Sequence, residues 1–175
     1  ITSTATRMAS WSLSGHSDPM AIEIERKFLV VGEGWRDHVE AETRLVQGYL
    51  SEEARTTVRV RIRGETAWLT LKGATQGISR LEFEYPIPVA DAEILLRELA
   101  VSPLIEKTRY HVRHERHLWE LDVFTGANAG LVLAELELTA VDEDFERPDW
   151  LGAEVSDDPR YFNVNLARHP YERWS

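Results

Sequence analysis

Two glutamates and a lysine alternate with apolar residues in a short segment near the start of the chain. Residues 22–29 read IEIERKFL. Because successive side chains of an extended strand point to opposite faces, Glu23, Glu25 and Lys27 would share one face. Paired carboxylates are hard oxygen ligands for a divalent cation, and a lysine ammonium group suits a phosphate oxygen. The segment therefore predicts chemistry that involves a metal ion and a phosphate group.

Later segments repeat this alternation of charged and apolar residues. The basic positions are Arg59, Arg61, Lys72, Arg80, Lys107 and Arg109. The acidic positions are Glu82, Glu84, Asp122, Glu135 and Glu137. An ordinary half-buried sheet also alternates, with its polar face in solvent. The polar positions here are almost purely ionic, which favours a shared charged cavity over a solvated face.

These segments are separated by turn residues, as expected for antiparallel strands. We predict eight strands, at 21–31, 43–51, 56–63, 66–73, 79–88, 104–113, 117–124 and 131–140. A helix is predicted over 91–100 with Asp91 as its N-cap, because Ile94, Leu95 and Leu99 form one apolar stripe. A second helical stretch is expected after Val141, and a short helix over 161–168.

The fold class that accommodates these elements is mainly β (α+β): a closed eight-stranded antiparallel β-barrel with flanking helices. Closure directs one face of every strand into the lumen. Burying so many charges is unfavourable unless they pair, hold metal ions or bind an ionic ligand. A phosphate chain with divalent cations satisfies both the basic and the acidic positions.

Composition limits the other possibilities. The chain has 175 residues, and 30 acidic against 20 basic residues give a net charge of −10, which argues against a nucleic-acid partner. The absence of cysteine excludes disulfides and thiolate sites. No apolar stretch approaches 18 residues, so no membrane partner is expected. We expect a cytoplasmic protein with one domain over 20–175, preceded by a disordered tail or non-native extension over 1–19.

The ordered set of charged segments resembles the CYTH superfamily, also called triphosphate tunnel metalloenzymes, across residues 20–175. The family's Glu-x-Glu-x-Lys hallmark stands as Glu23, Glu25 and Lys27. Residues 119–138, WELDVFTGANAGLVLAELEL, are similar to the short bacterial members. The resemblance implies a tunnel that binds a small-molecule triphosphate together with Mg²⁺ or Mn²⁺.

The resemblance also implies roles for individual residues. The implied metal ligands are Glu23, Glu25, Asp122, Glu135 and Glu137. The implied phosphate-binding residues are Lys27, Arg59, Arg61, Lys72, Arg80, Lys107 and Arg109. The implied catalytic residues are Glu82, Glu84 and Lys107. Some members carry a functional lysine near the C-terminus, for which this chain shows no clear equivalent, and Arg168 is the nearest basic residue.

The function implied is metal-dependent hydrolysis of a phosphoanhydride, with inorganic triphosphate as the favoured substrate and a homodimer as one possible assembly. The alternatives are an adenylate cyclase, a thiamine or nucleoside triphosphatase, and a non-catalytic domain that binds polyphosphate or nucleotide. For Glu82 and Glu84, simple ion pairs with neighbouring bases are the alternative to catalysis. His111, His114 and His117 could suggest zinc, but their spacing across a turn favours exposed side chains that do not converge.

Overall fold

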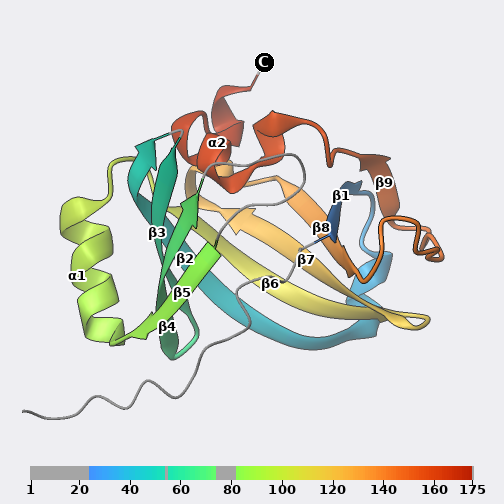
Figure 1. Cartoon of the computed structure of the whole chain (residues 1–175). Coiled ribbons are helices and arrows are strands. Elements are labelled where there is room, and N and C mark those ends of the chain that lie inside the picture. Colours follow the sequence, from blue (N-terminus) through green and yellow to red (C-terminus); the bar gives the residue numbers. More distant parts are fainter. Residues whose placement is uncertain (1–23, 54, 74–81, 175) are drawn as a thin grey trace, which may run out of the picture.

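The computed structural model describes residues 24–53, 55–73 and 82–174, which form one antiparallel sheet with a few helices around it (Figure 1). The strand order is β5-β4-β3-β2-β6-β7-β8-β1-β9. The strands are β1 (Ile24–Val30), β2 (Val39–Glu53), β3 (Thr56–Arg63), β4 (Thr66–Gly73), β5 (Glu82–Ile87), β6 (Ile105–His114), β7 (His117–Thr125), β8 (Val132–Leu138) and β9 (Leu151–Glu154). The mainly β class with flanking helices is thus confirmed, whereas the predicted tail over 1–19 lies outside the described residues.

The helices are short. They are α1 (Val89–Leu99), α2 (Asn163–Arg168) and four 3-10 turns: η1 (Gly34–His38), η2 (Gly126–Asn128), η3 (Pro159–Tyr161) and η4 (Tyr171–Arg173). The prediction of a helix over 91–100 is confirmed, but its N-cap is Pro88 rather than Asp91. Asp91 instead lies in the first turn, where a carboxylate interacts favourably with the positive end of the helix dipole.

The prediction of a helical stretch after Val141 is wrong. Residues 141–150 contain no helix, and they lead into the four-residue strand β9. Glu143 folds back to accept hydrogen bonds from the backbone N–H and the hydroxyl of Thr139, each at 2.7 Å. This turn and the proline at 148 leave no room for a regular helix.

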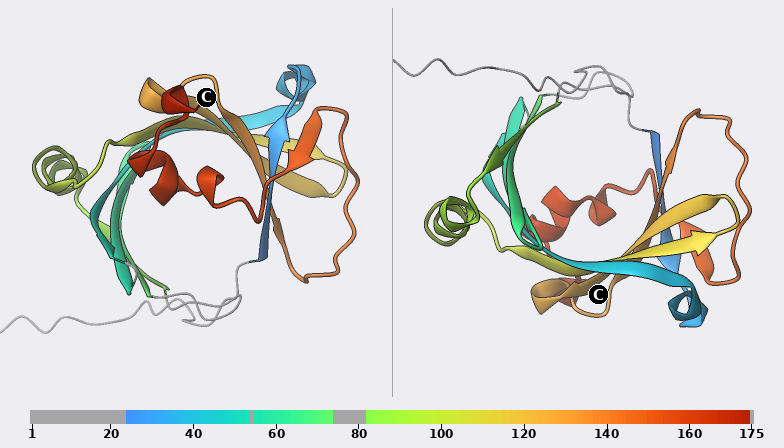
Figure 2. Two further views of the ribbon diagram at one scale, coloured as in Figure 1. Left: turned by 90° about the horizontal axis from the view of Figure 1, so that it is seen from above. Right: turned by 90° about the horizontal axis from the view of Figure 1, so that it is seen from below.

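The sheet curls strongly, so that it encloses α2 and the neighbouring turns while α1 lies outside (Figure 2). The prediction of eight strands in a closed barrel differs from this arrangement. Within the described residues β5 pairs only with β4, and β9 adds to the other edge by pairing with β1 at Phe28 and Val30. The short β9 was missed because four residues without alternation carry no periodic signal.

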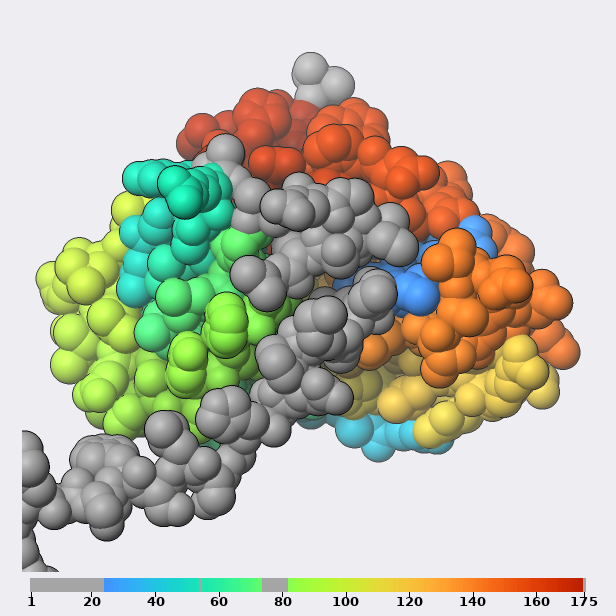
Figure 3. Space-filling view, viewed as in Figure 1, coloured from blue at the N-terminus to red at the C-terminus, as the bar shows by residue number. Residues whose placement is uncertain are grey.

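The convex face of the sheet is apolar and covered at two places. Helix α1 packs Ala92 and Leu96 against Val60 and its neighbours on β2, β3 and β4. On the other half of the sheet, Phe28 and Trp119 lie beneath Phe145 and Trp150 of the segment 139–150. This segment forms the right-hand side of the face seen in Figure 3. Both covers direct the alternating charged residues to the concave face.

One end of the concave face is also apolar, because the C-terminal segment fills it. Leu166 of α2 and Tyr161 of η3 pack against Ile105, Phe124 and Leu133 from three adjacent strands. The C-terminal residues therefore cap the top of the molecule in the orientation of Figure 3. In the described part of the chain, no helix is long and apolar enough to cross a membrane.

Candidate functional site

A charged zone follows the apolar end of the concave face. Four strands contribute an apolar residue that packs beside the C-terminal segment. Each of these strands also carries a charged residue two positions away, on the same face. These residues are Lys27, Lys107, Asp122 and Glu135, and all four are buried. The alternation seen in the sequence thus becomes a step along the concave face, from an apolar plug to a zone of buried ionic residues.

Arg109 is the centre of the ion pairs on β6, β7 and β8. Its Nε and Nη2 donate to the two oxygens of Asp122, each at 2.7 Å, and Nη2 also donates to Glu135 at 2.7 Å. Its Nη1 contacts Glu120. Although burial opposes its charge, Asp122 and then Glu135 raise the pKa of Arg109 above its ordinary value.

Lys27 bridges two carboxylates on neighbouring strands. Its Nζ donates to Glu25 at 2.9 Å and to Glu135 at 2.6 Å. Burial and then the nearby Glu135 carboxylate raise the pKa of Glu25, more than Lys27 lowers it. Burial would also raise the pKa of Glu135, but Lys27, Lys107 and Arg109 lower it well below its usual range. The two acids thus compete for the same cations.

Lys107 is sealed in the wall of the cavity. Its side chain is 2 % exposed and forms an ion pair with Asp122, whose side chain is 0 % exposed. Burial lowers the pKa of Lys107, while the Asp122 carboxylate opposes that change.

The other wall of the cavity is made by β3, β4 and β5. Glu84 accepts hydrogen bonds from Arg61 at 2.9 Å and from the Thr70 hydroxyl at 2.9 Å, and it lies 3.5 Å from Arg59. Glu82 pairs with Lys72 at 2.8 Å. The ion pairs with neighbouring bases, which were the alternative to catalysis for Glu82 and Glu84, are therefore present. Thr70, fully buried between Arg59 and Glu84, was not singled out from the sequence.

Two arginine donors in this wall have no partner among the described residues. The Nε atoms of Arg59 and Arg61 are buried and make no hydrogen bond there. Burial lowers the pKa of Arg61, and the positive charge of Arg59 lowers it further. Adjacent like charges with unused donors are suited to an anion that contacts both.

The predicted metal ligands come together only in part. Glu25, Asp122 and Glu135 belong to the ion-pair network above, and Glu137 is exposed with its Cα opposite that of Glu25. Glu23, like the predicted phosphate ligand Arg80, lies outside the described residues. Over the ranges that the structure covers, no three acidic or histidine side chains are gathered closely enough to hold a metal ion. The donors are nevertheless carboxylate oxygens, the type that Mg²⁺ and Mn²⁺ prefer.

Of the three histidines considered, His111 reaches the edge of this network, where its Nε2 lies 3.4 Å from Glu120. His117, expected to be exposed, is buried, and its Nε2 lies 3.0 Å from Glu143. His117 and His114 are opposite each other at the β6–β7 turn.

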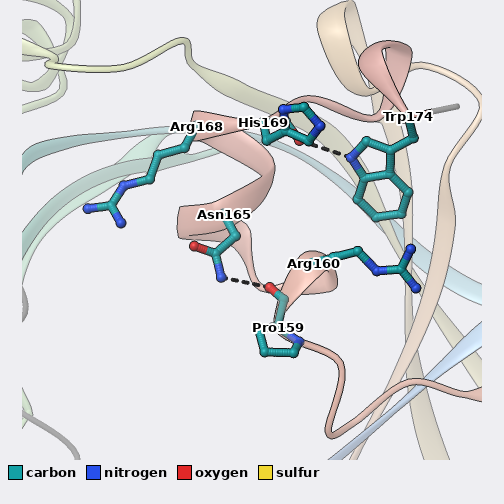
Figure 4. A pocket seen from close by; sticks show the side chains of 6 residues that line it. All are labelled: Pro159, Arg160, Asn165, Arg168, His169 and Trp174. Atoms are coloured by element: carbon teal, nitrogen blue, oxygen red, sulfur yellow. Dashed lines mark hydrogen bonds between the residues drawn. The ribbon is translucent and has the colours of Figure 1, made fainter.

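A separate cavity of about 240 Å³ lies at the C-terminal segment (Figure 4). Several of its polar groups are already used: Asn165 donates to the Pro159 carbonyl at 2.7 Å, and the Trp174 indole donates to the His169 carbonyl at 3.0 Å. Arg168, the basic residue considered in place of the family's C-terminal lysine, pairs with Glu52 of β2 at 2.6 Å. These contacts anchor the segment rather than leave donors for a ligand.

Known proteins share these features. A family model described as the CYTH domain matches residues 21–171. An inorganic triphosphatase of Acetivibrio thermocellus is 44% identical over 155 residues, which cover 89% of this chain and 99% of that protein. An inorganic triphosphatase of Nitrosomonas europaea is 39% identical over 149 residues, covering 83% and 96%.

A solved structure gives the same result for the fold. The crystal structure of the inorganic triphosphatase NE1496 matches with a TM-score of 0.64 and 36% identity, covering 86% of this chain and 97% of that one. The charged concave face and the match over nearly the whole described sheet lead to one conclusion: this chain belongs to the CYTH domain family.

Proposed function

We propose that this protein hydrolyses a phosphoanhydride bond of inorganic triphosphate, producing pyrophosphate and phosphate. The observation that carries the proposal is the pair of neighbouring arginines, the buried Arg59 and the half-buried Arg61, whose buried Nε donors have no partner among the described residues, on a concave face that carries further cations. A linear polyanion supplies acceptors to several cations at once. The two similar inorganic triphosphatases match this chain over nearly their whole length, and this supports the choice of substrate.

The phosphate chain would be held by bases from opposite walls of the cavity. The proposed ligands are Lys27, Arg59, Arg61, Lys72, Arg80, Lys107 and Arg109. Arg59 and Arg61 have free donors, whereas Lys107 and Arg109 would share their charge between carboxylates and phosphate oxygens. Cations fixed before the substrate arrives stabilise charge on the transferred group without reorganising.

Mg²⁺ or Mn²⁺ would be held by Glu23, Glu25, Asp122, Glu135 and Glu137. When bound, such an ion offsets phosphate charge and polarises phosphoryl oxygens. The chain prepares for it by keeping the Glu25 and Glu135 carboxylates on either side of Lys27. Burial and then repulsion from Glu135 raise the pKa of Glu25, and a bound cation would offset both effects.

The remaining proposed catalytic residues are Glu82, Glu84 and Lys107. Glu84 orients Arg61 and Thr70, and Glu82 holds Lys72, so both acids would fix the direction of the bases and of an attacking water molecule. Lys107 would stabilise the charge that develops on the transferred phosphoryl group.

The test is a turnover assay with inorganic triphosphate, ATP and thiamine triphosphate, each with Mg²⁺ and with Mn²⁺. We expect the highest kcat/KM with inorganic triphosphate, and phosphate and pyrophosphate in equal amounts. Cyclic AMP from ATP, or no phosphate release from any substrate, would contradict the proposal.

A pair of variants on one strand tests the site. Arg61→Met should raise KM for inorganic triphosphate about tenfold or more, because it removes a charged donor from the cavity. Arg63→Met is the matched control, since Arg63 is exposed at the end of β3. Equal kinetics for the two variants would place the phosphate elsewhere.

A further inference from the structure

A third unpaired donor lies beside the two arginines, on a residue that carries no charge. Gln47 of β2 is 2 % exposed, yet its Nε2 has no hydrogen-bond partner among the described residues. Buried amides are normally bonded, because an unpaired one loses its contacts with water and gains nothing in return. An unpaired amide in this position therefore needs an explanation.

The strand register puts Gln47 on the concave face of the sheet, among the ionic residues. Its Cα is opposite that of Arg61 on β3 and that of Ile105 on β6. Val46, the residue before it, packs on the convex face with α1. Gln47 therefore shares the concave face with Arg61, and directly opposed side chains on neighbouring strands lie close together.

Cations flank Gln47 on both sides. Arg59 is opposite the next concave position of β2, Tyr49, and Lys107 is opposite the preceding one, Leu45. Gln47 thus lies between the basic residues of β3 and those of β6. Its N–H groups can donate to an anion without adding to the repulsion among these cations.

The backbone around Gln47 is held firmly. A Cβ on the next residue, Gly48, would lie 2.7 Å from Leu104 Cδ2 and 2.9 Å from Leu96 Cδ2. The absence of a side chain there lets β2 pack directly against the segment around α1. This close packing restricts the backbone next to Gln47 and so preorganises the amide for a ligand.

We infer that Gln47 binds the substrate by donating a hydrogen bond to a non-bridging oxygen of the phosphate chain, between the oxygens held by Arg61 and by Lys107. This inference rests on the proposed function and adds a neutral residue to its set of charged ligands. Gln47 would fix the position of the chain along the cavity.

Two variants of nearly equal size separate binding from a structural role. Gln47→Met removes the donor and should raise KM for tripolyphosphate with Mg²⁺ about tenfold, with kcat changed less than about threefold. Gln47→Glu replaces the donor with a carboxylate and should raise KM about a hundredfold. In EDTA without substrate, the melting temperature of Gln47→Glu should equal or exceed that of the wild type, because its carboxylate can accept from the free Nε atoms of Arg59 and Arg61.

Thr108→Val is the control, since Thr108 lies on the opposite face of the adjacent strand β6 and should leave KM unchanged. If the wild type hydrolyses tripolyphosphate and both Gln47 variants keep its KM, the inference about Gln47 is wrong while the proposed function stands. If the wild type does not hydrolyse tripolyphosphate, and tripolyphosphate does not raise its melting temperature, the proposed function fails. Should Gln47→Met not fold, the KM of Gln47→Glu decides.

Discussion

At the scale of single residues, the site depends on a few charges that are buried together. Asp122 is fully buried and relies on Arg109 and Lys107, while Glu135 relies on Arg109 and Lys27. A buried pair adds little net stability over apolar residues, but loss of one partner leaves a costly unpaired charge. These buried ion pairs therefore fix the arrangement of the charged residues without adding much to the stability of the fold.

Arg109→Leu should reduce the free energy of unfolding by about 3 kcal/mol, because it removes one cation from both Asp122 and Glu135. Urea unfolding in EDTA at neutral pH measures the loss. Arg113→Leu is the control on the same strand, since the exposed Arg113–Glu40 pair is screened by solvent and its loss should change the free energy of unfolding far less. Equal losses would mean that the Arg109 network does not stabilise the fold.

The residue types of the cavity were predictable from the sequence, but their pairing was not. Lys27 and Glu135 are 108 positions apart, and Arg109 meets acids from two other strands. Alternation determines which face a side chain takes and says nothing about which distant strand lies beside it. Gln47 was missed for a related reason: among neighbours that are apolar in sequence, one neutral amide has no charge pattern to mark it.

At the scale of elements, β2 is the strand that joins the two halves of the sheet. It pairs with β3 along one edge and with β6 along the other, and Gly48 brings it close to the segment around α1. Because Gln47 precedes this glycine, packing on the convex face and binding on the concave face are linked through two adjacent residues.

Gly48→Ala should lower the free energy of unfolding by about 1 to 3 kcal/mol, because the added methyl group overlaps two leucine side chains. Chemical denaturation of the variant provides the measurement. Gly34→Ala is the matched control, since a Cβ there meets nothing within 4 Å and no loss is expected. A Gly48→Ala variant as stable as the wild type would show that the leucines have room to move.

The segment 139–150 gives a pH-dependent prediction. Hydrogen bonds from the Thr139 hydroxyl and backbone, and from His117, lower the pKa of Glu143 to about 2. Since this folded-state pKa lies below the ordinary value of 4.5, the stability contributed is fully present above pH 4.5 and is lost as the pH falls toward 2. Glu143→Gln should therefore be less stable than the wild type at pH 7, with the difference shrinking as the pH falls below 4.5.

Denaturant unfolding at pH 7, 5 and 3 compares the two proteins. Glu146→Gln serves as the control, because Glu146 is exposed on the same segment. A stability difference for Glu143→Gln that stays constant over this range would show that its carboxylate is not responsible.

At the scale of the whole molecule, the C-terminal part of the chain completes the curled sheet at two places. Helix α2 fills the apolar end of the curled sheet, and β9 extends the sheet beside β1 (Figure 2). A homodimer and a cytoplasmic location stay predictions, while the proposed site is built from residues of one chain.

Leu166→Ala should cost about 2 to 5 kcal/mol of unfolding free energy, because the fully buried Leu166 ties the C-terminal segment to the inner face of the sheet. Thermal and urea unfolding give the value. Phe162→Ala, at a position 40 % exposed just before α2, should change stability by less than about 1 kcal/mol. Similar effects at both positions would argue that the segment is not anchored through Leu166.

Alternation and turn chemistry by themselves determined much of this protein. They predicted β3 and β4 with correct bounds, the helix that became α1, and the set of charged side chains that share one face. These features are local, because strand period and turn preference act over a few residues. The opening pattern of Glu25 and Lys27 therefore indicated its chemistry before any fold was known.

Only the tertiary structure decided how those faces meet. It placed the C-terminal segment inside the curl, added β9 at the edge, paired Glu84 with Arg61, and left the Gln47 amide beside two unused arginine donors. Each of these outcomes depends on contacts between residues far apart in the chain. Burial then decides which polar groups are already satisfied and which remain available for a ligand.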